Sequence, residues 1–404
     1  MLLSIAAIFI IGLLSSWLCK KLKFPALFGM ILAGIAIGPH GLCLLDSSIL
    51  SISAELRRIA LLIILIRAGL KLELAVLKRV GRPALLLCFL PACFEIAGML
   101  LLAPRLLGLS LLESAILGAV VAAVSPAVVV PRMIRLIDTG YGVKQGIPQM
   151  ILAGASVDDV FVIVLFTTFT NLAQGAAVSW AGFARIPLSI LLGVLAGAAA
   201  GTLFELLFRK KPISPPVQAL AIFTAALLLD WLGTAFPALP FAGLIAIMAV
   251  GSGIRKQNQP MAARLSGIFD QLWMPAEMFL FVLVGASVAV SSLQTAGLGA
   301  VLLVLGVLVF RMAGVYCCTI SSPLTAREKL FCMLAYTPKA TVQAAIGGIP
   351  LAMGLPCGAT VLTVSVIAIL LTAPLGALAI DKTYKNLLTA SPPTTPQPLP
   401  PFPP

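Results

Sequence analysis

Thirteen apolar segments, each about 16 to 27 residues long, alternate in this chain with short polar or Gly- and Pro-containing stretches. A hydrocarbon core of about 30 Å is crossed by a helix of about 20 residues, so each segment has the length of a transmembrane helix. Because lipid offers no hydrogen-bond partners, a backbone inside it must be helical or form a closed barrel. The segments therefore predict an all-α polytopic membrane protein with thirteen transmembrane helices.

The predicted helices, numbered 1 to 13 in chain order, occupy residues 2–18, 25–40, 56–71, 83–104, 112–132, 148–171, 185–208, 217–233, 238–254, 268–291, 294–317, 327–349 and 359–380. Residues 1–390 form a single transmembrane unit in this division. Residues 391–404 are rich in proline and cannot build a core, so we expect a disordered tail.

Composition excludes several other classes of protein. Of the 404 residues, 60% are hydrophobic and 10% are charged, far from the balance of a soluble domain. The net charge is +13, but the basic residues lie in small groups between apolar segments without interleaved aromatic residues, which argues against nucleic-acid binding. The eight cysteines form no CxxC pair and His40 is the single histidine, so we expect no zinc, haem or other cofactor.

Basic residues also test the division into helices, because cytoplasmic connections are rich in Lys and Arg. Of the 27 Lys and Arg residues, twenty lie in the odd-numbered connections, at the helix ends beside them or at the C-terminus, four lie in the even-numbered connections or at the helix ends beside them, and three lie deeper inside helices. One missed helix would destroy this alternation. The pattern predicts an outside N-terminus and a cytoplasmic C-terminus, and the lack of targeting segments favours a bacterial inner membrane.

Helices 1–6 and 8–13 would start on opposite sides of the membrane, as in an inverted-topology repeat. Two correspondences support this pairing. Helix 5 is interrupted by a polar, proline-containing stretch at residues 124–126, and helix 12 is interrupted by another at residues 337–343. Helix 4 carries Glu95 where helix 11 carries Arg311.

Two adjacent carboxylates, Asp158 and Asp159, lie in the middle of helix 6. A charged side chain at bilayer depth costs roughly 2.5 to 3.5 kcal/mol, so this pair indicates a functional site. A proton or a metal cation can neutralise a carboxylate, and exchange between the two is the chemistry of antiport. Adjacent helical residues point about 100° apart, so we expect one Asp to face the ion route and the other to brace it.

The two interrupted helices predict the rest of the ion site. Broken transmembrane helices are tolerated where they line a cavity, and their half-helix ends supply partial charges. We expect helices 5 and 12 to cross, with Ser125, Pro126, Thr341 and Gln343 at the breaks and neutral oxygens of this set binding a sodium-sized ion. The alternative is that Pro126 and Pro338 merely kink the helices for packing.

Three further buried charges accompany the site. Glu95 and Arg311 offset one another as a buried pair, although Arg311 could pair with Asp158 instead. Arg311 keeps its proton at any working pH and is no proton carrier. Lys339 is either a proton carrier or a fixed positive charge at the end of a half-helix.

Several motifs resemble one known family, the NHA branch of the monovalent cation:proton antiporters. The matching stretches are LIRAGLKL (65–72), PACFEIA (91–97), GAVVAAVSPAVVVP (118–131), GYGVKQGIP (140–148), ASVDDVF (155–161), VFRMAG (309–314) and TPKATVQAA (337–345). The resemblance covers roughly helices 2 to 13. SPAVVVP, the double Asp and PKATVQAA in this order form a specific combination.

The resemblance implies a homodimer that exchanges Na⁺ or Li⁺ for H⁺ by an elevator-like movement. It implies a core domain of helices 3–6 and 10–13 and a dimerisation domain of helices 1–2 and 7–9. By the family's pattern Asp159 binds the ion and the proton, Asp158 is its neighbour, and Glu95 and Arg311 form the buried ion pair. Some relatives carry Lys at the position of Arg311, so Arg argues against a second proton carrier there.

Two rival functions stay open on the residues alone. A sodium-coupled solute symporter could share the inverted-repeat architecture, but adjacent aspartates at its centre would be unexpected. An intramembrane aspartyl protease needs two carboxylates that face each other from separate helices, and it is therefore disfavoured. We expect no enzymatic activity, and we expect the partners to be the bilayer, monovalent cations, protons and a second copy of the chain.

Overall fold

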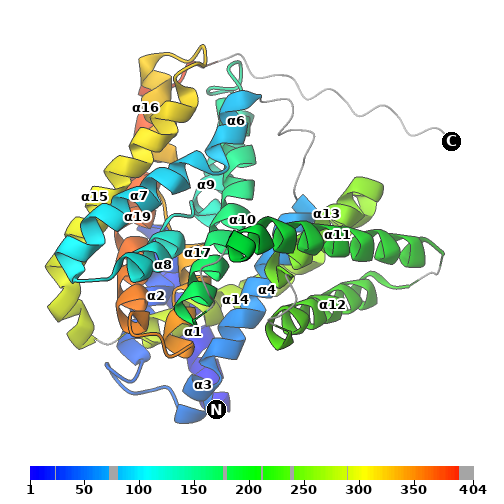
Figure 1. Ribbon diagram of the computed structural model, residues 1–404, viewed down its shortest axis with the longest axis horizontal. Coiled ribbons are helices and arrows are strands. Elements are labelled where there is room, and N and C mark those ends of the chain that lie inside the picture. The colour runs from blue at the N-terminus through cyan, green and yellow to red at the C-terminus, as the bar shows by residue number, and fades with distance from the viewer. Residues whose placement is uncertain are drawn as a thin grey trace.

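Every element in the described part of the chain is a helix, as the apolar segments predict (Figure 1). The computed structural model describes residues 1–22, 24–71, 81–175, 180–210, 213–236, 241–288 and 290–390. One antiparallel β-bridge among these residues joins Tyr141 to Ala390. The predicted proline-rich tail, residues 391–404, lies outside the described residues.

The helices are α1 (Leu2–Lys21), α2 (Ala26–Ile37), α3 (Ser47–Ser51), α4 (Ser53–Lys71), α6 (Arg82–Leu87), α7 (Leu90–Leu107), α8 (Leu111–Val121), α9 (Pro126–Asp138), α10 (Ile147–Ala173), α11 (Trp180–Lys210), α12 (Pro215–Ala235), α13 (Gly243–Gln257), α14 (Gln259–Ala286), α15 (Val290–Thr319), α16 (Ala326–Ala335), α17 (Thr341–Ile346), α18 (Ile349–Ala352) and α19 (Gly358–Leu387). In Figure 1, α11, α12 and α13 lie at the right, α7, α15 and α16 lie at the left, and α10 and α17 lie between them.

Nine helices or helix pairs in the described ranges are long and apolar enough to cross a membrane, namely α1, α6–α7, α8–α9, α10, α11, α12, α14, α15 and α19. The other four predicted spans coincide with α2, α4, α13 and α16–α18. α2 has 12 residues and α13 has 15, and α4 carries five charged side chains. The structure therefore confirms a polytopic helical protein, whereas the count of thirteen and the repeats stay predictions.

Both predicted helix breaks are present. Residues 122–125 separate α8 from α9, which begins at Pro126, and residues 336–340 separate α16 from α17. The predicted extent of the second break was wrong, because Thr341 and Gln343 are helical. Helical hydrogen bonding resumes soon after Pro338, with the Ala344 N–H donating to the Ala340 carbonyl at 3.0 Å.

The first halves of both broken helices begin with the same N-terminal capping motif. Ser110 and Glu113 form a capping box at the start of α8, and Thr325 and Glu328 form one at the start of α16. In a capping box each side chain accepts the backbone N–H of the other residue, which satisfies groups that the helix leaves unpaired. Each half-helix thus starts at a sharply defined residue.

Glycines bring two helix pairs into backbone contact. A Cβ atom on Gly69 of α4 would lie 2.0 Å from the Met248 carbonyl oxygen of α13, and a Cβ atom on Gly34 of α2 would lie 2.0 Å from the Val282 carbonyl oxygen of α14. Small residues allow such approach where lipid gives helices no hydrophobic reason to associate. These contacts join α4 to α13 and α2 to α14.

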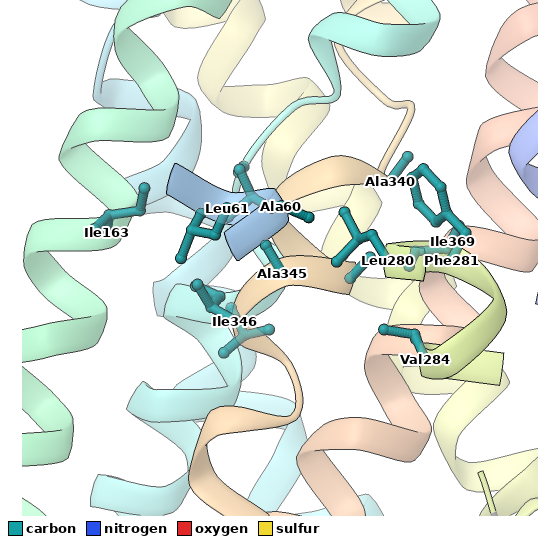
Figure 2. Close-up of a cluster of buried hydrophobic side chains, with 14 of the residues drawn as sticks. Ala60, Leu61, Ile163, Leu280, Phe281, Val284, Ala340, Ala345, Ile346 and Ile369 are labelled. Carbon is teal, nitrogen blue, oxygen red and sulfur yellow. The ribbon is translucent and has the colours of Figure 1, made fainter. Parts of the chain in front are cut away.

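The short helix α17 lies in the middle of the apolar core. Ala345 and Ile346 of α17 pack among residues of α4, α10, α14 and α19, including Leu61, Ile163 and Phe281 (Figure 2). A six-residue helix has little stability of its own, so this packing holds it in place. The apolar core therefore positions the second helix break.

The Gly69 contact predicts a packing defect in Gly69→Ala. The added methyl group has no room against the Met248 carbonyl, and such overpacking costs about 1 to 3 kcal/mol. We expect a lower melting temperature of the detergent-solubilised protein in fluorescence-detected size-exclusion chromatography. The control is Gly267→Ala, because a Cβ atom there meets nothing within 4 Å. Equal melting temperatures for the two variants would contradict the close contact.

Candidate functional site

The two helix breaks contact each other directly. The Ser125 N–H, at the start of α9, donates to the Pro338 carbonyl at 2.8 Å. The Val124 N–H donates to Oδ2 of Asp158 on α10 at 2.8 Å. At the breaks, backbone groups that lack a partner within their own helix are therefore bonded to each other and to a carboxylate. Buried backbone groups need such partners.

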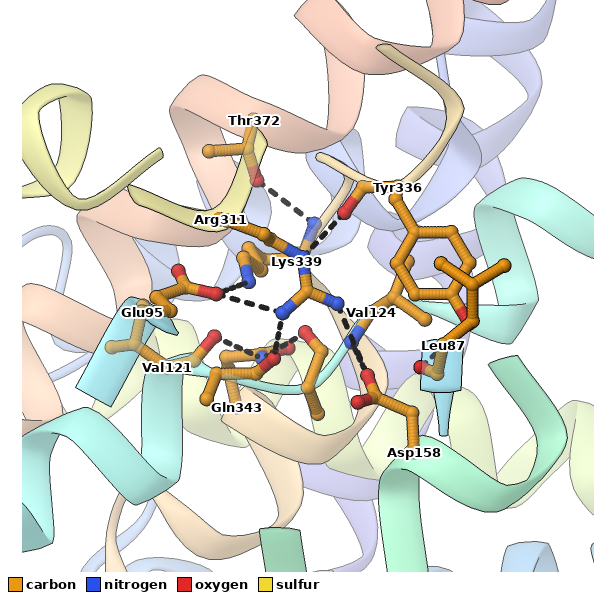
Figure 3. Close-up of polar contacts among 12 residues, drawn as sticks. Leu87, Glu95, Val121, Val124, Asp158, Arg311, Tyr336, Lys339, Gln343 and Thr372 are labelled. Atoms are coloured by element: carbon orange, nitrogen blue, oxygen red, sulfur yellow. Dashed lines mark hydrogen bonds and ion pairs between the residues drawn. The ribbon is translucent and has the colours of Figure 1, made fainter. Parts of the chain in front are cut away.

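Arg311 of α15 is fully buried and holds both breaks (Figure 3). Its Nη1 contacts Glu95 of α7 at 2.7 Å, and its Nη2 contacts Oδ2 of Asp158 at 3.1 Å. Its Nε donates to the Tyr336 carbonyl at 2.5 Å, and its Nη1 also donates to the Ala122 carbonyl. One guanidinium thus binds two carboxylates and the carbonyl ends of both α8 and α16.

Lys339 completes a balanced set of buried charges. It is fully buried, and its Nζ lies 2.6 Å from Oε2 of Glu95, the same oxygen that Arg311 contacts. Its backbone N–H is bound by the Thr372 hydroxyl at 2.8 Å. Two cations, Arg311 and Lys339, therefore meet two anions, Glu95 and Asp158, and such balance is what makes buried charges tolerable.

Gln343 satisfies the C-terminal end of α8. Its Nε2 donates to the Val121 carbonyl at 3.1 Å and to the Ala123 carbonyl at 2.9 Å (Figure 3). These carbonyls form the negative end of a half-helix dipole. The amide group of Gln343 is therefore oriented by its two donated bonds, which turns its Oε1 away from them.

Asp158 and Asp159 face different surroundings, as their helical spacing predicts. Asp158 is fully buried and bound by Arg311 and Val124, whereas Asp159 is half-buried and lines a cavity of about 20 Å³. Thr341 lines the same cavity, and the other lining residues are apolar. That volume holds about one water molecule or one cation of similar size.

Six buried side-chain oxygens around the breaks have no hydrogen-bond partner among the described residues: Glu95 Oε1, Ser125 Oγ, Asp158 Oδ1, Asp159 Oδ1, Thr341 Oγ1 and Gln343 Oε1. Buried polar atoms in proteins are nearly always bonded, so a group of such oxygens indicates a ligand. Hard cations prefer oxygen ligands of this kind. Two of them, Asp159 Oδ1 and Thr341 Oγ1, belong to side chains that line the small cavity, and oxygens of this type suit a small dehydrated cation.

Comparison with known proteins agrees with this chemistry. Residues 5–382 match the family described as "Sodium/hydrogen exchanger, transmembrane". The chain belongs to the sodium/hydrogen exchanger family.

Relatives of this exchanger include sodium/hydrogen exchanger 9B2 of Xenopus tropicalis, with 32% identity over 96% of this chain and 75% of that protein. Human sodium/hydrogen exchanger 9B2 is 32% identical over 90% of this chain and 70% of that protein. These matches confirm the predicted resemblance to the NHA branch. The family consists of transporters and not enzymes, and neither the symporter nor the protease finds support.

The fold of the exchanger is similar to that of the sodium proton antiporter MjNhaP1 from Methanocaldococcus jannaschii at pH 8. The TM-score is 0.82, with 21% sequence identity, 94% of this chain covered and 97% of that chain covered. At this level of identity the similarity establishes the fold alone.

The structure brings all nine predicted site residues of the exchanger to one region. The two predicted alternatives for Arg311 both hold, since it contacts Glu95 and Asp158 together. Pro126 is the first residue of α9 and fixes where that half-helix begins. Their roles in transport stay predictions.

Sequence reasoning missed three contributors to the site. The carbonyls of Ala122 and Tyr336 and the hydroxyl of Thr372 bind Arg311 or Lys339. Backbone carbonyls carry no signal in the side-chain pattern. Thr372 could have been noticed as a polar residue in an otherwise apolar stretch of α19.

Two other membrane charges have partners that the sequence left open. Arg67 pairs with Asp270, and its Cζ lies 5.8 Å from the ring centre of Trp273. Asp230 is bound by Arg58 at 2.6 Å. Neither pair includes a residue of the helix breaks.

The shared carboxylate predicts strong coupling between Glu95 and Lys339. In Glu95→Gln the Lys339 charge loses its partner, and breaking a buried pair costs about 3 to 5 kcal/mol. We expect a large drop in melting temperature. The double variant Glu95→Gln/Lys339→Gln should recover part of it, because no lone charge is left. Additive losses in this double-mutant cycle would show that the two residues do not interact.

Proposed function

We propose that this exchanger moves Na⁺ or Li⁺ across the membrane in one direction and H⁺ in the other, with Asp159 binding the cation and the proton in turn. The supporting observation is the position of Asp159, which lines a cation-sized cavity beside the two helix breaks. The relatives named above are sodium/hydrogen exchangers, which supports Na⁺ and H⁺ as the transported ions.

Competition for one carboxylate explains the coupling. With Asp159 deprotonated the site holds a cation, and with Asp159 protonated the site is neutral and holds none. An unoccupied anion is costly in a low-dielectric interior, so the empty charged form does not cross. Each passage in one direction therefore carries a cation and each return carries a proton.

The remaining residues give the carboxylate fixed surroundings. Asp158 is bound by Val124 and Arg311, and its role is to hold the site in place without exchanging its own partners. Ser125, Thr341 and Gln343 supply neutral oxygens for the cation. Arg311 is always charged and carries no proton. Lys339 is bound to Glu95 and acts as a fixed positive charge at the break.

We also propose the elevator-like movement and the homodimer that the family resemblance implies. The ion-pair network joins α7, α10, α15 and the two broken helices, so these elements would move as one core domain. The family resemblance implies that helices 3 and 10, which are α4 and α14, belong to this domain. The tight glycine contacts of α4 with α13 and of α14 with α2 instead favour their placement with the dimerisation domain.

The finer architecture belongs to the same proposal. We propose thirteen spans in two inverted repeats, supported by the matching breaks and by the capping boxes at the starts of α8 and α16. The distribution of Lys and Arg supports an outside N-terminus and a cytoplasmic C-terminus. Residence in a bacterial inner membrane stays a prediction, and the relatives reported above are animal proteins.

Replacement of Asp159 tests the central claim. We expect Asp159→Asn to abolish sodium-dependent proton movement in proteoliposomes, measured with a pH-sensitive dye, because an amide binds no proton and offers no negative charge. The matched control is Asp138→Asn, which removes an exposed Asp at the end of α9. Sodium-dependent proton movement at the wild-type rate by a folded Asp159→Asn protein would contradict the role of Asp159.

The predicted orientation can be tested with a native cysteine. Cys43 is exposed in the connection between α2 and α3, which the topology places outside. We expect a membrane-impermeant maleimide to label it in right-side-out vesicles, and Cys43→Ser to remove that labelling. Labelling from the cytoplasmic face alone would reverse the topology.

A further inference from the structure

A second, larger cavity lies at the N-terminal end of α4. Its volume is about 300 Å³, and it is bounded by the first turns of α4 and by residues of α17 and α18. Three charged side chains, Glu55, Arg57 and Arg58, line it. We call this cavity the vestibule. In the proposed topology it lies on the outer side of the membrane.

The vestibule adjoins the small cavity that contains Asp159. Leu61 and Ala345 line both cavities, and no other residue is shared between them. Both side chains are buried, with 2% and 5% exposure, and they pack together in the apolar cluster of Figure 2. Only an apolar contact between α4 and α17 therefore separates the charged vestibule from the ion site.

Arg57 is the unusual residue of the vestibule. It is 8% exposed, and its Nε donates to the Ser53 carbonyl of its own helix at 3.2 Å. Glu55 lines the same cavity and its carboxylate acts on the Arg57 charge, but Glu55 is exposed to solvent, and none of the ion pairs among the described residues includes Arg57. The neighbouring Arg58, in contrast, is bound by Asp230 at 2.6 and 2.9 Å.

The backbone of the second broken helix makes room for this guanidinium. A Cβ atom on Gly348, between α17 and α18, would lie 2.3 Å from Nη1 of Arg57. Any side chain there would displace the guanidinium. Arg57 is thus held beside the element that carries Thr341, and it stays charged at any working pH.

We propose that the vestibule is the route by which the cation reaches Asp159 from this face, and that Arg57 is a positioning residue that sets the apparent Na⁺ affinity on this face alone. This inference rests on the proposed antiport function. A fixed positive charge lowers the concentration of cations in a narrow aqueous space, without contact with the bound ion. Salt weakens the effect, because mobile ions screen the charge.

Arg57→Gln tests the electrostatic role. In proteoliposomes of defined orientation at low ionic strength, we expect the KM for Na⁺ on the vestibule face to fall about threefold, with kcat and the KM on the opposite face unchanged. The difference from wild type should shrink when choline gluconate raises the ionic strength. Arg57→Lys, which keeps the charge, should have the wild-type KM.

The matched control is Arg105→Gln. Arg105 is exposed at the end of α7 on the same predicted side, and its one hydrogen bond to the described residues is to the Leu101 carbonyl of its own helix, at 3.4 Å. We expect no change in KM. Equal changes on both faces, or a change that persists at high ionic strength, would overturn the role of Arg57. A KM difference present with chloride but absent with gluconate would overturn it too, by identifying a bound anion.

Thiol accessibility tests the route independently of the charge. In a Cys43→Ser background, Ala54→Cys places a thiol in the vestibule. A membrane-impermeant methanethiosulfonate reagent should label it from the outer face and slow transport. Absence of labelling, or labelling without slowed transport, would overturn the route. In both experiments the parent protein is first shown to exchange Na⁺ for H⁺. Absence of exchange by the parent would contradict the antiport function, and it is thereby distinguished from a failure of the proposed route.

Discussion

The site of this exchanger depends on the neutralisation of charge among fully buried side chains. Arg311 contacts Glu95, Asp158 and the carbonyl ends of α8 and α16 from one guanidinium. Those carbonyls are the negative ends of two half-helix dipoles, and a cation is favourable beside each. A planar guanidinium has five donors in a fixed fork. It can therefore bind two carboxylates and two carbonyls at once better than a lysine ammonium could. Without it, Asp158 and the carbonyl ends of both breaks would lack a compensating charge, and Glu95 would keep Lys339 as its cation.

The division of labour between the two aspartates follows from the same network. Asp158 directs an oxygen toward Arg311 and the Val124 N–H, so it is already compensated. Asp159 lies about 100° further round α10 and lines the small cavity beside Thr341. One carboxylate is thus held by the protein, and the other lines the cavity in which we propose that the mobile ion binds. In this proposal the fixed charge, Asp158, and the exchangeable charge, Asp159, are adjacent residues of one helix.

Much of this arrangement could be predicted from the sequence, because membrane burial makes polar residues conspicuous. Asp158, Glu95, Arg311 and Lys339 stand out against apolar segments, and Pro126 and Pro338 mark where helices cannot continue. The residues that could not be predicted act through backbone groups. Ala122 and Tyr336 contribute carbonyls, and Gly348 contributes space for Arg57, none of which has a signature in the side-chain pattern.

The sequence alone determined the all-helical membrane class, the position of the two breaks and the set of charges, since length, hydropathy and proline act locally along the chain. Tertiary structure decided which charges meet. Arg311 binds both Glu95 and Asp158, Lys339 shares Glu95, and Arg57 lines a cavity together with Glu55 and Arg58. Ion pairs between α7, α10, α15 and the second break join residues up to 244 positions apart. Helix packing alone sets those distances, and no local pattern encodes them.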